Sequence, residues 1–220
     1  MIKQNFDVNS IYVPNMADLD IFKYEKAKNR SNVFDFVSTG HLIKSKRMDL
    51  TISAFSKAFK KDENVRLTIF GHGVEEAYLN KLVNDLDLAD RVYIMGQTSR
   101  AEISHKYNES DCFVLATQTE TFGVAYIEAL AAGLPVIATR SGGPEVFVND
   151  INGILIDVDD ENQLIDSMRF MYNRAQSYDH YRIAEDIKNK YSSDKIASML
   201  IDIYNEAMSS YANEELTKYV

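Results

Sequence analysis

The hydrophobic positions of this 220-residue chain fall into short continuous runs, separated by segments in which apolar residues recur at helical spacing. The runs of strand length are Val33–Val37, Leu67–Phe70, Val92–Met95, Cys112–Ala116, Val136–Ala138 and Gly153–Ile156. Continuous apolar strands are typical of sheets covered on both faces. The segments between them with helical spacing are Leu50–Phe59, Ala77–Leu88 and Ala101–Tyr107. This alternation predicts an α/β fold: a Rossmann-like domain with a six-stranded parallel sheet flanked by helices.

The two ends of the chain differ from this middle part. Residues 1–32 contain no long periodic element, and we interpret them as the end of a linker or an N-terminal extension. After the last strand the pattern is helical, with helices predicted over Glu161–Ala175, Tyr181–Lys190 and Asp194–Met208. We therefore expect the α/β domain to span residues 33–175 and C-terminal helices to occupy residues 176–220.

Composition and charge exclude several classes of protein. The net charge is −9, and a nucleic-acid binder needs clustered Lys and Arg, so no nucleic-acid partner is expected. The single cysteine, Cys112, lies in an apolar run and is expected to be a buried inert thiol. The four histidines have no paired spacing, and no metal is expected. Without a signal peptide or an apolar run of ~18 residues, we expect the chain in the cytoplasm, or at a membrane surface within a longer enzyme.

A single charged residue stands in an apolar helix predicted for Phe122–Ala132. Glu128 has apolar neighbours on every side, and such a helix is normally buried. A buried carboxylate without a partner is costly, so Glu128 should contact either a protein cation or a ligand. A buried salt bridge and a ligand contact both remain open from the residues alone.

A polar loop precedes this helix at the predicted carboxyl end of a strand, where open α/β sheets bind ligands. The loop contains Glu120, and Gly123 falls in the first turn of the helix, where a bare backbone lets an anion approach the free N–H groups. Alternatively, Glu120 simply favours the helix N-terminus and Gly123 is a packing glycine.

A second loop, after the first predicted strand, combines Gly40 with the cations Lys46 and Arg47 ahead of a helix. A glycine followed by cations suits a diphosphate. A solvated basic loop is the structural alternative.

These features resemble the donor-binding signature of the retaining GT-B glycosyltransferases of family GT4. The signature has two glutamates separated by seven residues, here Glu120 and Glu128, with Phe122 and Gly123 after the first. It continues as Ala-x-Gly-x-Pro-Val, here Ala131–Val136. The basic loop matches the family at Gly40, Leu42, Lys46 and Asp49, but His41 replaces its arginine. Near the start, Pro14, Asn15, Asp18 and Phe22 match the end of the family's interdomain segment.

The resemblance implies the C-terminal, donor-binding half of a GT-B enzyme, which binds a nucleotide-diphosphate sugar and needs neither metal nor other cofactor. It assigns Glu120 to catalysis beside the transferred sugar and Glu128 to the ribose. Diphosphate contacts carry over to Lys46 and to the backbone at Phe122, Gly123 and Val124. Either Arg47 substitutes for the missing arginine or the diphosphate binds more weakly. The nucleobase is assigned to Gly96, Gln97 and Thr98. The base, whether of UDP, GDP or ADP, stays open.

Several alternatives remain. An acceptor-binding N-terminal domain is expected to be absent from the chain, which would then transfer sugar poorly or not at all. The chain could instead be a non-catalytic nucleotide-binding module, or a GT-B-type epimerase. Gly71-His72-Gly73 does not complete a dinucleotide fingerprint, which argues against NAD. Eight residues of helix span ~12 Å, whereas glycosidase carboxylates lie ~5–9.5 Å apart, which argues against a hydrolase.

Overall fold

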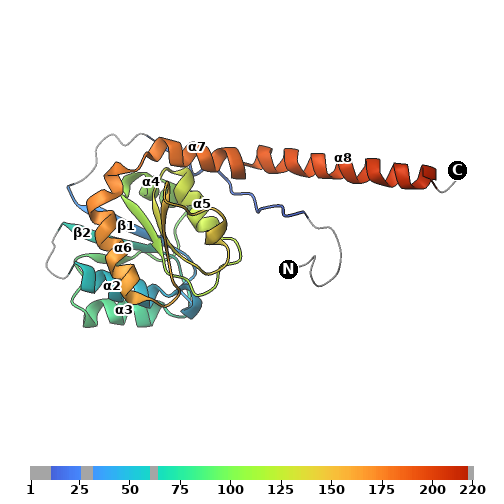
Figure 1. Cartoon of the computed structure of the whole chain (residues 1–220). Helices are drawn as coiled ribbons and strands as arrows, with labels where there is room; N and C mark the ends of the chain where they lie inside the picture. Colours follow the sequence, from blue (N-terminus) through green and yellow to red (C-terminus); the bar gives the residue numbers. More distant parts are fainter. Residues whose placement is uncertain (1–10, 26–31, 60–63, 218–220) are drawn as a thin grey trace.

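The computed structural model describes residues 11–25, 32–59 and 64–217, with side chains described as far as residue 209. Its centre is a parallel six-stranded sheet with the order β3-β2-β1-β4-β5-β6 (Figure 1). The strands are β1 (Phe34–Thr39), β2 (Val65–Phe70), β3 (Val92–Ile94), β4 (Cys112–Leu115), β5 (Val136–Thr139) and β6 (Gly153–Ile156). The sheet predicted from the six apolar runs is therefore confirmed, with boundaries that differ by at most two residues.

Helices cover both faces of the sheet. They are α2 (Met48–Ala58), α3 (Glu76–Asp85), α4 (Arg100–Glu109), α5 (Val124–Ala131), α6 (Glu161–Arg174), α7 (His180–Tyr191) and α8 (Ser193–Thr217). Short 3-10 turns occupy Lys44–Lys46, Pro144–Val146 and Ala175–Ser177. Helix α2 packs against α3 and α6, whereas α5 packs against α4 and α7, so the two groups form separate layers. This is the doubly covered arrangement expected for continuous apolar strands.

The strand order reverses at the centre of the sheet, where β1 lies between β2 and β4. Both central strands are buried: Phe36 and Val37 in β1 and Phe113 and Val114 in β4 have no exposed surface. In open α/β sheets, ligands bind at the carboxyl ends of the strands beside such a reversal. The loops after β1 and β4 therefore define the edge where a ligand site is expected.

The first described segment packs on the domain. Ala17, Leu19 and Phe22 are buried, and the Phe22 ring lies 5.6 Å from the ring of Tyr107 in α4. The Ser104 hydroxyl donates a 2.7 Å hydrogen bond to the carbonyl of Ile21. The first described segment is therefore part of the packed domain. The domain boundaries predicted at residues 32 and 175 stay predictions. Residues 1–10, 26–31 and 218–220 lie outside the described part.

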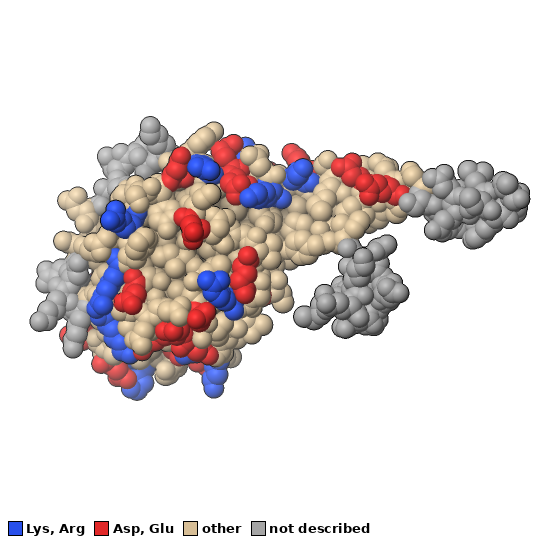
Figure 2. Space-filling view, in the orientation of Figure 1, with Lys and Arg blue, Asp and Glu red and all other residues tan. Residues whose placement is uncertain are grey.

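Helix α8 continues beyond α7 and projects from the domain (Figure 1). Its projecting part exposes Ile201, Tyr204 and Met208, and Figure 2 shows little basic charge along it. Among the described residues, no helix combines the length and apolar character needed to cross a bilayer.

Candidate functional site

The two loops at the central edge of the sheet are joined by an ion pair. Lys46 Nζ lies 2.6 Å from Glu120 Oε2, and their side chains are only 20% and 15% exposed. Backbone contacts hold the loops together, because Ser45 O accepts hydrogen bonds from the Gln118 N–H at 2.8 Å and the Thr117 hydroxyl at 2.9 Å. The sequence-predicted residues Lys46 and Glu120, 74 positions apart, thus meet in a partly buried site.

Glu120 is fixed by its backbone to the loop after β5. Its N–H donates to the Ser141 carbonyl at 3.1 Å, and its carbonyl accepts from the Gly143 N–H at 2.7 Å. A Cβ on Gly143 would lie 2.4 Å from the Phe122 carbonyl oxygen, so the close approach of these loops requires glycine there. Gly143 therefore helps to fix the position of Glu120.

Gly123 is the N-cap of α5, in a left-handed conformation with φ 97° and ψ 52°. The helix therefore begins at Val124, two residues later than the pattern predicted, because this conformation is not helical. No side chain caps it, so the N–H groups of Val124 and Ala125 have no acceptor within the helix. A Cβ at Gly123 would lie 3.3 Å from Glu120 Cγ. The free end of α5, with its partial positive charge, therefore adjoins the Lys46–Glu120 pair.

Glu128 lies one turn further into α5 and is 7% exposed. Arg100 Nη2 donates a 2.8 Å hydrogen bond to Glu128 Oε1, so the buried salt bridge left open by the sequence is present. Burial raises the pKa of the Glu128 carboxyl; Arg100 opposes this shift and the charge of Asp18 adds to it. Glu128 also borders a cavity of about 430 Å³ with Asp18 and Val124. The carboxylate thus has a protein partner and an open side.

Arg47 is held by two carboxylates rather than left free for a ligand. Its guanidinium pairs with Asp159, and its Nε lies 3.2 Å from Asp49 Oδ1. It borders another cavity, of about 570 Å³, together with Lys44 and Gln118. Arg47 thus pairs with two carboxylates, whereas Lys46 pairs with Glu120 alone among the described residues.

The loop assigned to the nucleobase follows β3. Gly96 has φ 69°, and its carbonyl accepts a 2.9 Å hydrogen bond from the Gly71 N–H. Gln97 and Thr98 line a cavity of about 200 Å³ that also contains His41 and His72. A capping box, in which the Ser99 and Glu102 side chains each accept from the other's backbone N–H, starts α4 directly after this loop.

Arg100 is the site residue that the sequence analysis missed. The available signal was an arginine at the first position of a helix, directly after the loop assigned to the nucleobase. The structure also confirms that Cys112 is buried, and this burial raises the pKa of its thiol well above the ordinary range. Within the described residues, no group of three or more His, Cys, Asp or Glu could hold a metal ion.

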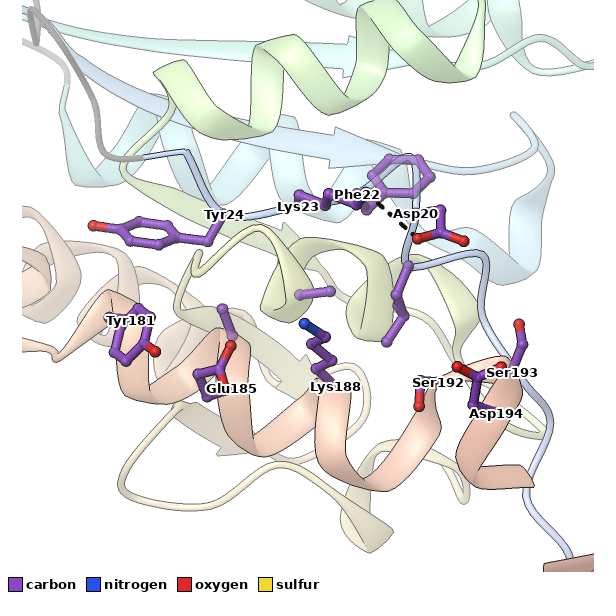
Figure 3. Close-up of a pocket in the computed structure, with 13 residues that line it drawn as sticks. Asp20, Phe22, Lys23, Tyr24, Tyr181, Glu185, Lys188, Ser192, Ser193 and Asp194 are labelled. Atoms are coloured by element: carbon purple, nitrogen blue, oxygen red, sulfur yellow. Dashed lines mark ion pairs between the residues drawn. The ribbon is translucent and has the colours of Figure 1, made fainter. Parts of the chain in front are cut away.

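A further cavity, of about 370 Å³, reaches Ala131, the last residue of α5. Figure 3 shows the side chains that line it. It is bordered by Ala131 and by residues of the first segment, α7 and the start of α8, including Tyr24, Tyr181 and Lys188. The residues assigned from the sequence do not line it.

Comparison with known proteins identifies relatives of this chain. A family model described as "Glycosyl transferases group 1" matches residues 20–187. The N-acetyl-alpha-D-glucosaminyl L-malate synthase of Bacillus anthracis is 26% identical over 225 residues, which are 98% of this chain and 58% of that protein.

Solved structures of other proteins resemble this chain in fold. A mutant of S. aureus TarM, in complex with Fondaparinux, alpha-GlcNAc-glycerol and UDP, superposes with a TM-score of 0.79 at 25% identity, over 93% of this chain and 41% of that chain. The sucrose-phosphate synthase of Thermosynechococcus elongatus shares the fold, with a TM-score of 0.82 at 19% identity, over 95% of this chain and 56% of that chain. This chain therefore spans about half the length of these relatives.

Proposed function

Because the chain belongs to the family of glycosyl transferases group 1, we propose that it binds a nucleotide-diphosphate sugar for transfer to an acceptor hydroxyl, with retention of configuration. The observation that carries the proposal is the meeting of Lys46, Glu120 and the uncapped start of α5 at the carboxyl ends of β1 and β4. A cation beside free helix N–H groups suits a diphosphate, and a carboxylate next to them suits a sugar.

Lys46 and the start of α5 would hold the diphosphate and stabilise its departure. When the bond between the anomeric carbon and the phosphate oxygen breaks, negative charge develops on the leaving diphosphate. The Lys46 ammonium and the N–H of Val124 would stabilise this charge, which is the electrostatic form of catalysis. Arg47 contributes less in this proposal, because Asp49 and Asp159 already neutralise it.

Glu120 would act on the positive charge of the transferred sugar. In the free chain its carboxylate pairs with Lys46. A bound diphosphate would replace it as the partner of Lys46 and leave Glu120 beside the sugar. There it would stabilise the positive charge that develops at the anomeric carbon.

Glu128 and the loop after β3 would bind the nucleoside. A carboxylate accepts hydrogen bonds only, which suits the hydroxyl groups of a ribose. Gly96, Gln97 and Thr98 would contact the base through backbone groups. The UDP named in the TarM complex supports uridine as the base. The α-linked sugars named for TarM and for the malate synthase support retention.

Efficient transfer in this proposal requires a second, acceptor-binding half, which positions the acceptor and excludes water. A non-catalytic donor-binding module is the alternative, and His41 in place of the family arginine favours it. The cytoplasmic location expected from the sequence stays a prediction.

A thermal-shift panel with UDP, GDP, ADP, their sugar conjugates and NAD tests the proposal. A nucleotide at about 100 times its Kd adds about 2.7 kcal/mol of stability, or about 5–11 °C in Tm for a chain of this size. We expect UDP to give this shift, Lys46→Ala to abolish it, and Lys81→Ala, which removes a lysine paired with Asp85 on α3, to leave it unchanged. The absence of any nucleotide-dependent shift, or an equal shift in Lys46→Ala, would contradict the proposal.

A further inference from the structure

Arg100 reaches Glu128 from a different helix and is itself held from two directions. Its Nη2 donates to Glu128 Oε1 at 2.8 Å, and its guanidinium carbon lies 5.1 Å from the centre of the Phe22 ring. Phe22 is buried in the first described segment, whereas Glu128 belongs to α5. A guanidinium placed over an aromatic ring gains cation–π attraction. The two contacts restrict the position of the Arg100 side chain, although it is 50% exposed.

The contact with Arg100 leaves one side of the Glu128 carboxylate open. Only Oε1 is engaged, since no described residue donates a hydrogen bond to Oε2. Glu128 borders the cavity of about 430 Å³ that also contains Asp18, Val124 and Arg100. One oxygen atom is therefore anchored by the protein, and the other is free to accept a hydrogen bond from a ligand.

The charges around Glu128 explain why its contact with Arg100 matters. Burial and the negative charge of Asp18 raise the pKa of the Glu128 carboxyl, whereas Arg100 opposes both effects. Tyr107 is another ionisable neighbour, and burial raises the pKa of its phenol, which therefore stays neutral. Arg100 is thus the group that favours the carboxylate, which is an acceptor at both oxygen atoms.

We propose that Arg100 is a positioning residue for nucleotide binding, which orients Glu128 so that its free oxygen accepts a hydrogen bond from a ribose hydroxyl. The inference rests on the proposed function. It adds a residue from outside the resembled signature and couples the loop assigned to the nucleobase to the carboxylate assigned to the ribose. Because Arg100 follows Ser99 directly, one short segment from Gly96 to Arg100 would act on both parts of the nucleoside.

Calorimetric titration with UDP at about pH 6, 7 and 8 tests this role. The variants are Arg100→Gln, Arg100→Lys, Glu128→Gln and the double variant Arg100→Gln/Glu128→Gln. Arg140→Gln is the matched control, because Arg140 is 52% exposed and also pairs with a carboxylate, Asp157. Melting temperatures establish that each variant is folded.

We expect Arg100→Gln to weaken UDP binding about tenfold at neutral pH, which corresponds to about 1.4 kcal/mol. The loss should grow toward pH 6, since Glu128 without Arg100 takes up a proton at higher pH. The wild type and Arg140→Gln report how much of the pH dependence comes from UDP itself. In the Glu128→Gln background, Arg100→Gln should cause no further loss, because the two side chains act as one unit. Arg100→Lys retains the charge but not the planar fork, so we expect about threefold weaker binding without the added pH dependence.

An Arg100→Gln variant that binds within twofold of the wild type at every pH would overturn the inference. If that variant does not fold, Arg100→Lys is also made in the Glu128→Gln background, and an equal loss of UDP affinity in both backgrounds would overturn the inference as well. In both cases Lys46→Ala still weakens UDP binding if the proposed function is correct. If the wild type binds no nucleotide, the proposed function fails first and this inference falls with it.

Discussion

Replacing Gly123 with alanine would place a methyl group where the candidate diphosphate site meets the hydrophobic core. The residue has φ 97°, so any side chain is strained there. A left-handed conformation costs an L-residue about 1–2 kcal/mol. The new Cβ would also lie 2.8 Å from Cδ2 of the Tyr126 ring and 3.3 Å from Phe147 Cζ.

The Tyr126 ring has little freedom to move away. It has no exposed surface, and its hydroxyl donates a 2.6 Å hydrogen bond to the Leu115 carbonyl. Overpacking of this kind costs about 1–3 kcal/mol. With the backbone term, Gly123→Ala should destabilise the chain by about 2–5 kcal/mol, or about 4–20 °C in Tm for a chain of this size.

Gly96→Ala separates the cost of the left-handed backbone from the cost of overpacking. Gly96 also has a positive φ, 69°, but a Cβ added there would have no atom within 4 Å. Its substitution should therefore cost only the backbone term of about 1–2 kcal/mol. Differential scanning calorimetry of both variants gives the comparison. Equal losses of Tm would refute the argument that the Tyr126 ring and its neighbours are fixed around Gly123.

Three buried side chains, Cys112, Asp35 and Glu128, give further tests of the structure. The Cys112 thiol should stay unreactive toward a thiol reagent at about pH 8 until the chain unfolds, because burial raises its pKa; rapid labelling of the folded chain would contradict this. Asp35→Asn removes the 1%-exposed carboxylate that pairs with Arg66 and Lys106. Because both cations are partly exposed, we expect the free energy of unfolding to fall by roughly 3 kcal/mol, visible as a lower Tm. An unchanged Tm would count against this prediction. Since burial raises the pKa of Glu128 above its ordinary value of 4.5, the folded chain binds that proton more tightly than the unfolded chain. Wild-type stability should therefore fall relative to Glu128→Gln as the pH rises above about 4.5, and a difference in Tm that does not change with pH would oppose this assignment.

The strands were predictable because continuous apolar runs have few other structural solutions. The start of α5 was less so, because the sequence does not reveal that Gly123 adopts a left-handed conformation. Pairwise contacts between distant residues were the least predictable. Lys46 and Glu120 were singled out separately, but their ion pair depends on how the loops after β1 and β4 meet. Arg100 was missed because its contact with Glu128 arises only when α4 packs beside α5.

A crystal structure of the chain with UDP tests the central proposal most directly. We predict that the diphosphate lies within hydrogen-bonding distance of Lys46 Nζ and the Val124 N–H. The Lys46–Glu120 contact should be open, and a ribose hydroxyl should donate to Glu128. UDP bound elsewhere, for example in the cavity between α7 and the first described segment (Figure 3), with the Lys46–Glu120 pair intact, would contradict the account.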